Sequence, residues 1–73
     1  MIHFLDITRE TCPMTFVKVK LQLARMDAGH ELEIILNEGE PLENVPHSCE
    51  EQGYRVISVD ACGDGKHRVL VKK

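Results

Sequence analysis

The sequence predicts an α/β (α+β) fold, a two-layer βαβαββ sandwich in which a four-stranded mixed sheet carries two helices on one face. Three observations predict it. Short β-rich segments first alternate with helix-like segments. Two further β-rich segments then follow, separated by a glycine-rich turn. Finally, 73 residues suffice for a single domain, 1–73, and leave no room for a second. A strand–helix–strand start favours a right-handed crossover within one sheet, which places both helices over the same face.

The first strand and the first helix are predicted at 2–7 and 13–27. Pro13 is a good first helical residue, because its missing N–H would have no helical partner there. Helical spacing of apolar residues predicts a wide buried stripe. Its members are Phe16, Val17, Val19, Leu21, Leu23, Ala24 and Met26. Gly29 is predicted to end the helix in the C′ position.

The later elements follow from turn and cap signals. The remaining strands are predicted at 31–36, 54–61 and 67–72, with a hairpin turn at 63–65. Residues 37–41 have the composition of a loop. Asn44 is predicted to cap a short second helix that has Pro46 in its first turn and stops at Gly53.

Composition and charge exclude several classes of function. The net charge of −3 gives no broad basic field, so no direct nucleic-acid contact is expected. No apolar run approaches the roughly 20 residues that span a bilayer, so no membrane contact is expected. The start of the chain has no signal-peptide pattern, and its cysteines are predicted to be free thiols, which together indicate a cytoplasmic protein.

The cysteines and histidines do not predict a metal site. Three cysteines cannot close a disulfide framework, and no Cys-x-x-Cys pair is present to anchor zinc. The four histidines are scattered, and no two have the spacing of ligands on one helix face. They are His3, His30, His47 and His67.

Cys12 is the residue that the sequence marks for chemistry. It stands where the first strand gives way to the helix that begins at Pro13. Unpaired N–H groups and the positive end of the helix dipole favour an anion there, which lowers the pKa of a thiol. Thr15 offers a backbone N–H and a hydroxyl to a side chain at the cap. Arg9 favours the thiolate and Glu10 opposes it. The alternative is a small buried residue at a junction between elements.

The other two cysteines are predicted to have different surroundings. Cys49 lies on the apolar stripe of the short second helix, where a free cysteine packs as a small hydrophobic side chain. Cys62 lies at the edge of the glycine-rich hairpin and is expected to be exposed.

The chain resembles the TusA/SirA family of small sulfur-carrier proteins over essentially its whole length. The resemblance is carried by Leu5-Asp6, Cys12-Pro13, Gly29, Asn44-Val45-Pro46, Gly53 and residues 68–72. It implies a fold similar to the C-terminal domain of a bacterial translation initiation factor. It also implies that Cys12 accepts sulfane sulfur as a persulfide, with no cofactor beyond that sulfur, and that Pro13 shapes the site.

The resemblance further implies a pair of protein partners. A cysteine desulfurase or a rhodanese would be the donor, and an acceptor protein would take the sulfur onward in tRNA thiolation, molybdenum-cofactor supply or sulfur oxidation. Exposed cations on the first helix would form a docking rim for these partners. These cations are Lys18, Lys20 and Arg25.

The chain departs from the family pattern around the cysteine. The family motif Cys-Pro-x-Pro has Thr15 in place of its second proline. Arg9 replaces a glycine, Glu10 replaces an apolar residue, and Asn37-Glu38 stands where an acidic pair is common. Thr15 restores a backbone donor that proline would remove, so an anion remains accommodated.

Two other functions fit parts of the same pattern. A glutaredoxin-like monothiol redox protein also places a Cys-x-x-x motif on a strand–helix turn, and Thr15 would occupy the place of its resolving cysteine. A non-catalytic module that binds RNA or protein is the second alternative, although the chain has three aromatic residues, which offer little for base stacking. Selenium handling is a variant of the sulfur hypothesis.

Overall fold

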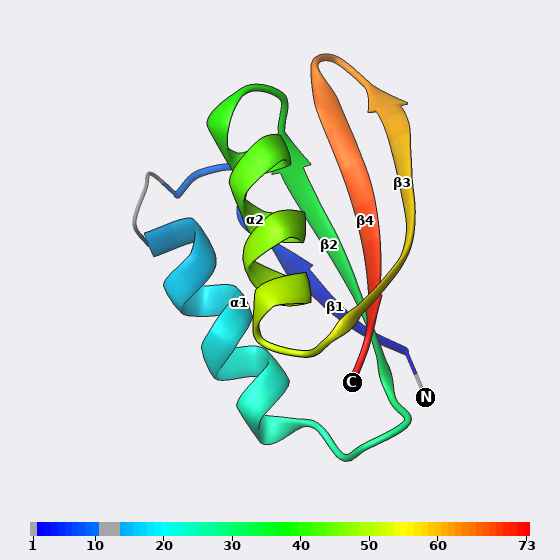
Figure 1. Ribbon diagram of the computed structural model, residues 1–73. Helices are drawn as coiled ribbons and strands as arrows, with labels where there is room; N and C mark the ends of the chain where they lie inside the picture. Colours follow the sequence, from blue (N-terminus) through cyan, green and yellow to red (C-terminus); the bar gives the residue numbers. More distant parts are fainter. Residues whose placement is uncertain (1, 11–13) are drawn as a thin grey trace.

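The computed structural model describes residues 2–10 and 14–73 and has the predicted βαβαββ order (Figure 1). The elements are β1 (Ile2–Asp6), α1 (Met14–Arg25), β2 (Glu31–Asn37), α2 (Glu40–Glu51), β3 (Arg55–Gly63) and β4 (Lys66–Lys72). The four strands form one sheet in the order β1-β2-β4-β3. β1 and β2 are parallel, whereas β4 is antiparallel to both of its neighbours, so the sheet is mixed as predicted.

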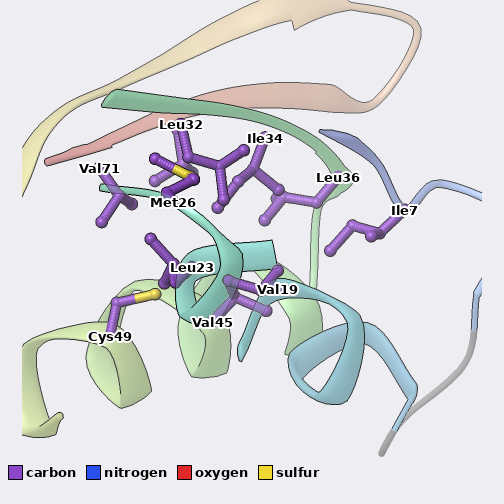
Figure 2. Close-up of a cluster of buried hydrophobic side chains, with 11 residues drawn as sticks. Ile7, Val19, Leu23, Met26, Leu32, Ile34, Leu36, Val45, Cys49 and Val71 are labelled. Atoms are coloured by element: carbon purple, nitrogen blue, oxygen red, sulfur yellow. The ribbon is translucent and has the colours of Figure 1, made fainter. Parts of the chain in front are cut away.

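Both helices lie over the same face of the sheet, which confirms the two-layer arrangement (Figure 1). The core fills the space between these layers. β2 shows the alternation directly: Leu32, Ile34 and Leu36 point to the helices and are fully buried, while the residues between them are half-buried. The buried apolar side chains are Ile7, Val19, Leu23, Met26, Leu32, Ile34, Leu36, Val45, Cys49, Val69 and Val71 (Figure 2). Burying each of the larger ones stabilises the fold by about 1.5–3 kcal/mol.

The buried stripe of α1 is narrower than predicted. Val19 and Leu23 are buried, but Val17 and Leu21 are exposed by 38% and 54%, and Ala24 is also exposed. The spacing of the exposed residues, i, i+4 and i+7, is itself that of a helix stripe. A helix in a two-layer domain contacts its neighbours along one face, so the second apolar stripe remains on the surface.

Gly29 does not end α1, which corrects the predicted C′ position. The helix stops at Arg25, and the Lys73 ammonium donates to the carbonyl of Met26 at 2.6 Å. Gly29 instead lies in the turn before β2 with φ of +91°, a left-handed conformation that glycine adopts without strain. Its N–H donates to the carbonyl of Lys73 at 3.1 Å, which ties this turn to the end of β4.

The second helix begins earlier than predicted. α2 starts at Glu40, so residues 40 and 41 are helical rather than loop, and Asn44 lies within the helix instead of capping it. Pro41 suits the first turn because its fixed φ is already helical. Pro46 is tolerated inside the helix. Packing overrides the cost of its missing N–H, because the apolar side of α2, with Val45 and Cys49, is buried against the rest of the core.

The C-terminal hairpin is close to its prediction. β3 and β4 extend one or two residues further into the turn than expected. The pairing of β3 is irregular at two places, between Val56 and Ser58 and between Ala61 and Gly63. Such bulges twist an edge strand and weaken its ability to pair with another chain.

Candidate functional site

The chain that leads to Cys12 leaves the sheet through a tight turn. The N–H of Ile7 donates to the carbonyl of Ile35 at 2.9 Å, which extends the pairing of β1 and β2 by one residue. The N–H of Glu10 then donates to the carbonyl of Ile7 at 3.1 Å and closes a turn over residues 7–10. Ile7 is 1% exposed, so the start of the turn is fixed in the core. The predicted site residues Cys12 and Pro13, together with Thr11, lie outside the described residues.

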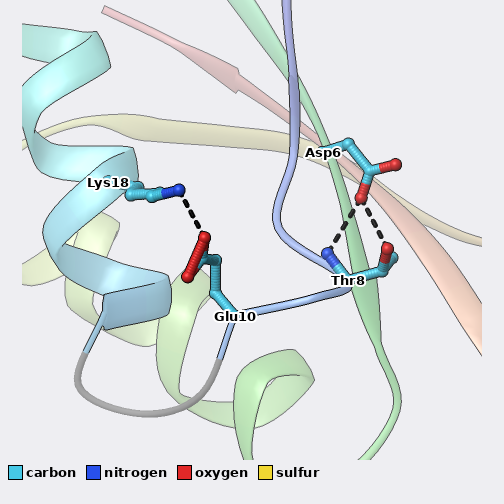
Figure 3. Close-up of polar contacts among 4 residues, drawn as sticks. All are labelled: Asp6, Thr8, Glu10 and Lys18. Atoms are coloured by element: carbon cyan, nitrogen blue, oxygen red, sulfur yellow. Dashed lines mark hydrogen bonds and ion pairs between the residues drawn. The ribbon is translucent and has the colours of Figure 1, made fainter.

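Three hydrogen bonds converge on Thr8 in this turn. The Asp6 carboxylate accepts from the N–H of Thr8 at 2.8 Å and from its hydroxyl at 2.7 Å (Figure 3). On the other side, Nδ2 of Asn37 donates to the carbonyl of Thr8 at 2.7 Å. We call Asp6, Thr8 and Asn37 the Thr8 clamp. The Thr8 hydroxyl and then the Thr8 N–H hold the pKa of Asp6 below its ordinary value, so its carboxylate is charged at neutral pH.

An ion pair bridges the two sides of the cysteine segment. Lys18, in the second turn of α1, pairs with Glu10 at the end of the turn (Figure 3). Both side chains are partly exposed, so the pair contributes little to stability. Its effect is local, because the positive charge of Lys18 offsets the negative charge of Glu10. Glu10 is the residue expected to oppose a thiolate at Cys12.

The first turn of α1 is suited to an anion. Within Met14–Arg25 this turn carries no acidic side chain that would compete for the positive end of the dipole. Thr15 is 3% exposed, so its side chain anchors this turn in the interior. Its backbone N–H belongs to the set of N–H groups at a helix start that have no partner within the helix. Arg9, by contrast, is exposed in the turn over residues 7–10.

The outer face of α1 combines apolar and basic side chains. Met14, Val17 and Leu21 are 43%, 38% and 54% exposed and lie on successive turns. The predicted docking residues Lys18, Lys20 and Arg25 are also exposed. Met14–Arg25 contains these cations and no acidic residue, although the chain as a whole has a net charge of −3. The helix is therefore a local basic, partly apolar surface on an acidic protein.

The other two cysteines lie where the sequence predicted. Cys49 is fully buried on α2, and its sulfur lies in the core near Leu23 (Figure 2). Burial, with a smaller contribution from the negative charge of Glu50, raises the pKa of the Cys49 thiol to about 11. Cys62 is exposed on β3, where the strand pairing is irregular.

The sequence also did not predict a contact between two histidine side chains. Nε2 of His3 lies 3.1 Å from Nδ1 of His30. The parallel register pairs His3 with Leu32, which brings residue 30 onto the same side of the sheet as its diagonal neighbour. This contact depends on strand pairing, so the spacing of the two histidines in the sequence does not predict it.

Across residues 2–10 and 14–73 no group of three or more His, Cys, Asp or Glu side chains could hold a metal ion. No helix in the same residues is long and apolar enough to cross a membrane.

The fold defines the class as a small two-layer α+β domain, and comparison with known proteins identifies the family. The family model described as "Sulfurtransferase TusA" matches residues 3–73. The chain therefore belongs to the TusA/SirA family of sulfur-carrier proteins, as its sequence resemblance predicted.

Individual relatives agree with this assignment. A protein of Archaeoglobus fulgidus named "Putative sulfur carrier protein" is 39% identical over 69 residues, covering 94% of this chain and 78% of the relative. The Escherichia coli protein named "Putative sulfur carrier protein TsuB" is 29% identical over 73 residues, covering 100% of this chain and 97% of the relative. The crystal structure of a SirA-like protein from Desulfitobacterium hafniense has the same fold, with a TM-score of 0.84 at 22% identity, covering 99% of this chain and 96% of that one.

Proposed function

We propose that this protein carries sulfane sulfur as a persulfide on Cys12, accepting it from a cysteine desulfurase or a rhodanese and passing it to an acceptor protein. Membership of the TusA/SirA family supports a sulfur-carrier role. The observation that carries the assignment to Cys12 is its place in the chain, between a pinned turn ending at Glu10 and the helix that starts at Met14. Cys49 is sealed in the core, and Cys62 lies on the hairpin.

The transfer step needs no oxidant or reductant beyond the persulfide donor. The Cys12 thiolate attacks the terminal sulfur of the donor's persulfide, the donor's S–S bond breaks, and the donor leaves as a thiolate. A new S–S bond leaves Cys12 as a persulfide anion. The start of α1 favours both the attacking thiolate and this anion, because each places negative charge where helix N–H groups and the dipole are positive.

The outer face of α1 is the docking surface in this proposal. Exposed Met14, Val17 and Leu21 supply apolar contact area, and the basic side chains favour a partner with an acidic rim. Replacing Lys20 and Arg25 together with glutamate is expected to slow second-order sulfur transfer by roughly tenfold at low salt, with the difference shrinking as salt is added. Replacing Arg55 on β3 and Lys72 on β4 in the same way is the matched charge control, because both are exposed and they pair at the end of the sheet away from the Thr8 clamp.

Mass spectrometry after incubation with a cysteine desulfurase and cysteine, without reductant, tests the proposal. We expect a reductant-labile gain of one sulfur atom, localised by peptide mapping to Cys12. Cys12→Ser should fold normally and gain no sulfur, while Cys62→Ser should gain sulfur at the wild-type rate. Sulfur on Cys62 alone, or full loading of Cys12→Ser, would contradict the proposal. Reduction of glutathione-mixed disulfides without any sulfur uptake would instead support a monothiol redox protein.

A further inference from the structure

We infer that Asp6 and Asn37 are positioning residues for Cys12: through Thr8 they hold the turn over residues 7–10, which comes just before the cysteine in the chain. The inference deepens the proposed function and rests on it. It begins from the Thr8 clamp, in which three hydrogen bonds of 2.7–2.8 Å fix one residue of a four-residue turn.

The two clamp partners come from the ends of neighbouring strands. Asp6 is the last residue of β1, and Asn37 is the last residue of β2. Because β1 and β2 are parallel, their C-terminal ends lie at the same edge of the sheet, where Asp6 pairs with Ile35. Hydrogen bonds from the ends of both strands therefore hold the turn at the edge where the chain leaves the sheet. The bond from Glu10 to Ile7 then closes the turn at Glu10.

The clamp does little for the core. Asp6 is exposed and Thr8 is half-buried, and neither belongs to the buried apolar cluster. The two bonds to Asp6 are exposed and the bond from Asn37 is part-buried. Such bonds add little to folding stability, because water takes their place in the unfolded chain. Three hydrogen bonds therefore fix the conformation of Thr8 although they add little to the stability of the domain. This points to a role at the candidate site that follows the turn in the chain.

The turn is close enough to Cys12 in the chain to matter. One residue separates Glu10 from Cys12, and one separates Cys12 from Met14. Helix-dipole stabilisation falls off within the first turn, so a small displacement of the thiol removes much of it. Loosening the clamp is therefore expected to raise the pKa of the Cys12 thiol toward the roughly 8.5 of a free cysteine.

The experiment compares the pH profile of iodoacetamide alkylation at Cys12 in the wild type and in Asn37→Ala and Asp6→Ala, read by peptide mass spectrometry. We expect the midpoint at Cys12 to rise by about half a unit or more in both variants. Sulfur loading at pH 7 should slow several-fold, while alkylation of Cys62 stays unchanged. Asp6→Asn keeps one oxygen acceptor for Thr8 and should shift the midpoint less than Asp6→Ala. Asn44→Ala, at an exposed position on α2, is the matched control.

The sign of the Asp6→Ala effect separates positioning from simple electrostatics. Removing a nearby negative charge would lower the pKa of a thiol, whereas loss of positioning raises it. A midpoint that falls, or profiles that superimpose on the wild type in variants with native circular dichroism, would overturn the inference. Because alkylation involves no sulfur transfer, an upward shift in a protein that takes up no sulfur would refute the proposed function and leave the positioning role standing.

Discussion

Cys49 offers a direct test of the claim that only one of the three cysteines is built for chemistry. Its thiol is fully buried, and its pKa is raised to about 11. At pH 8 a thiol with that pKa is about 0.1% thiolate, whereas an ordinary thiol with a pKa of about 8.5 is about 24% thiolate. Because the thiolate is the reactive form, ionisation alone makes Cys49 about 200-fold slower to alkylate than such an ordinary thiol. Exclusion of the reagent from the core slows it further.

The assay is timed alkylation with iodoacetamide at pH 8, quenched and quantified by peptide mass spectrometry. Cys62, in the same molecule, is the exposed reference, and the ratio of the two rates cancels errors in reagent concentration. In concentrated urea the ratio should approach one, because unfolding removes the burial that both raises the pKa of Cys49 and excludes the reagent from it. Native Cys49 that reacts within tenfold of Cys62 would refute the reasoning, since it would show that α2 opens readily or that the thiol is not buried.

Three further outcomes follow from the fold. Leu23→Ala should lower the free energy of unfolding by about 3 kcal/mol, whereas Leu21→Ala, on the exposed side of the same helix, should change it by less than about 0.5 kcal/mol; urea denaturation measures both. NMR titration should place the midpoint of the Asp6 carboxyl below 3.8, and Thr8→Ala should raise it. The stability that Asp6 adds is therefore present above its unfolded pKa and is lost as pH falls through the lower folded value. Gly39→Ala should cost about 1–3 kcal/mol in the same urea assay, because φ there is +99° although no atom lies within 4 Å of the added Cβ.

Much of the fold could be predicted because local patterns and packing agree. β2 alternates between buried and half-buried residues, and the glycine-rich turn joins two clear strands. The start of α2 was missed because Gly39, Glu40 and Pro41 have the composition of a loop, and only the packing of Leu42 and Val45 rewards an earlier helix. The outer stripe of α1 was missed for the opposite reason. Val17 and Leu21 repeat with perfect helical spacing, and periodicity cannot distinguish a second, exposed apolar face from the core.

The candidate site could likewise be predicted only in part. A cysteine before a helix can be recognised from the sequence because helix starts have local signals. The Thr8 clamp could not be recognised, because the bond from Asn37 to Thr8 joins residues 29 positions apart in the chain. It exists only once β1 and β2 are parallel and in register.

The position of β4 has a consequence for synthesis on the ribosome. β4 is the last strand in the chain but lies between β2 and β3, so β3 has no neighbour in the sheet, and β2 lacks one of its two, until β4 has emerged from the exit tunnel. Even when every element before Lys66 has emerged, the edges of β2 and β3 that β4 would cover stay open. Val69 and Val71, which complete the core, also arrive with this strand. Folding of this domain should therefore occur late and in one step, and a ribosome stalled within β4 would hold an unfinished, aggregation-prone chain.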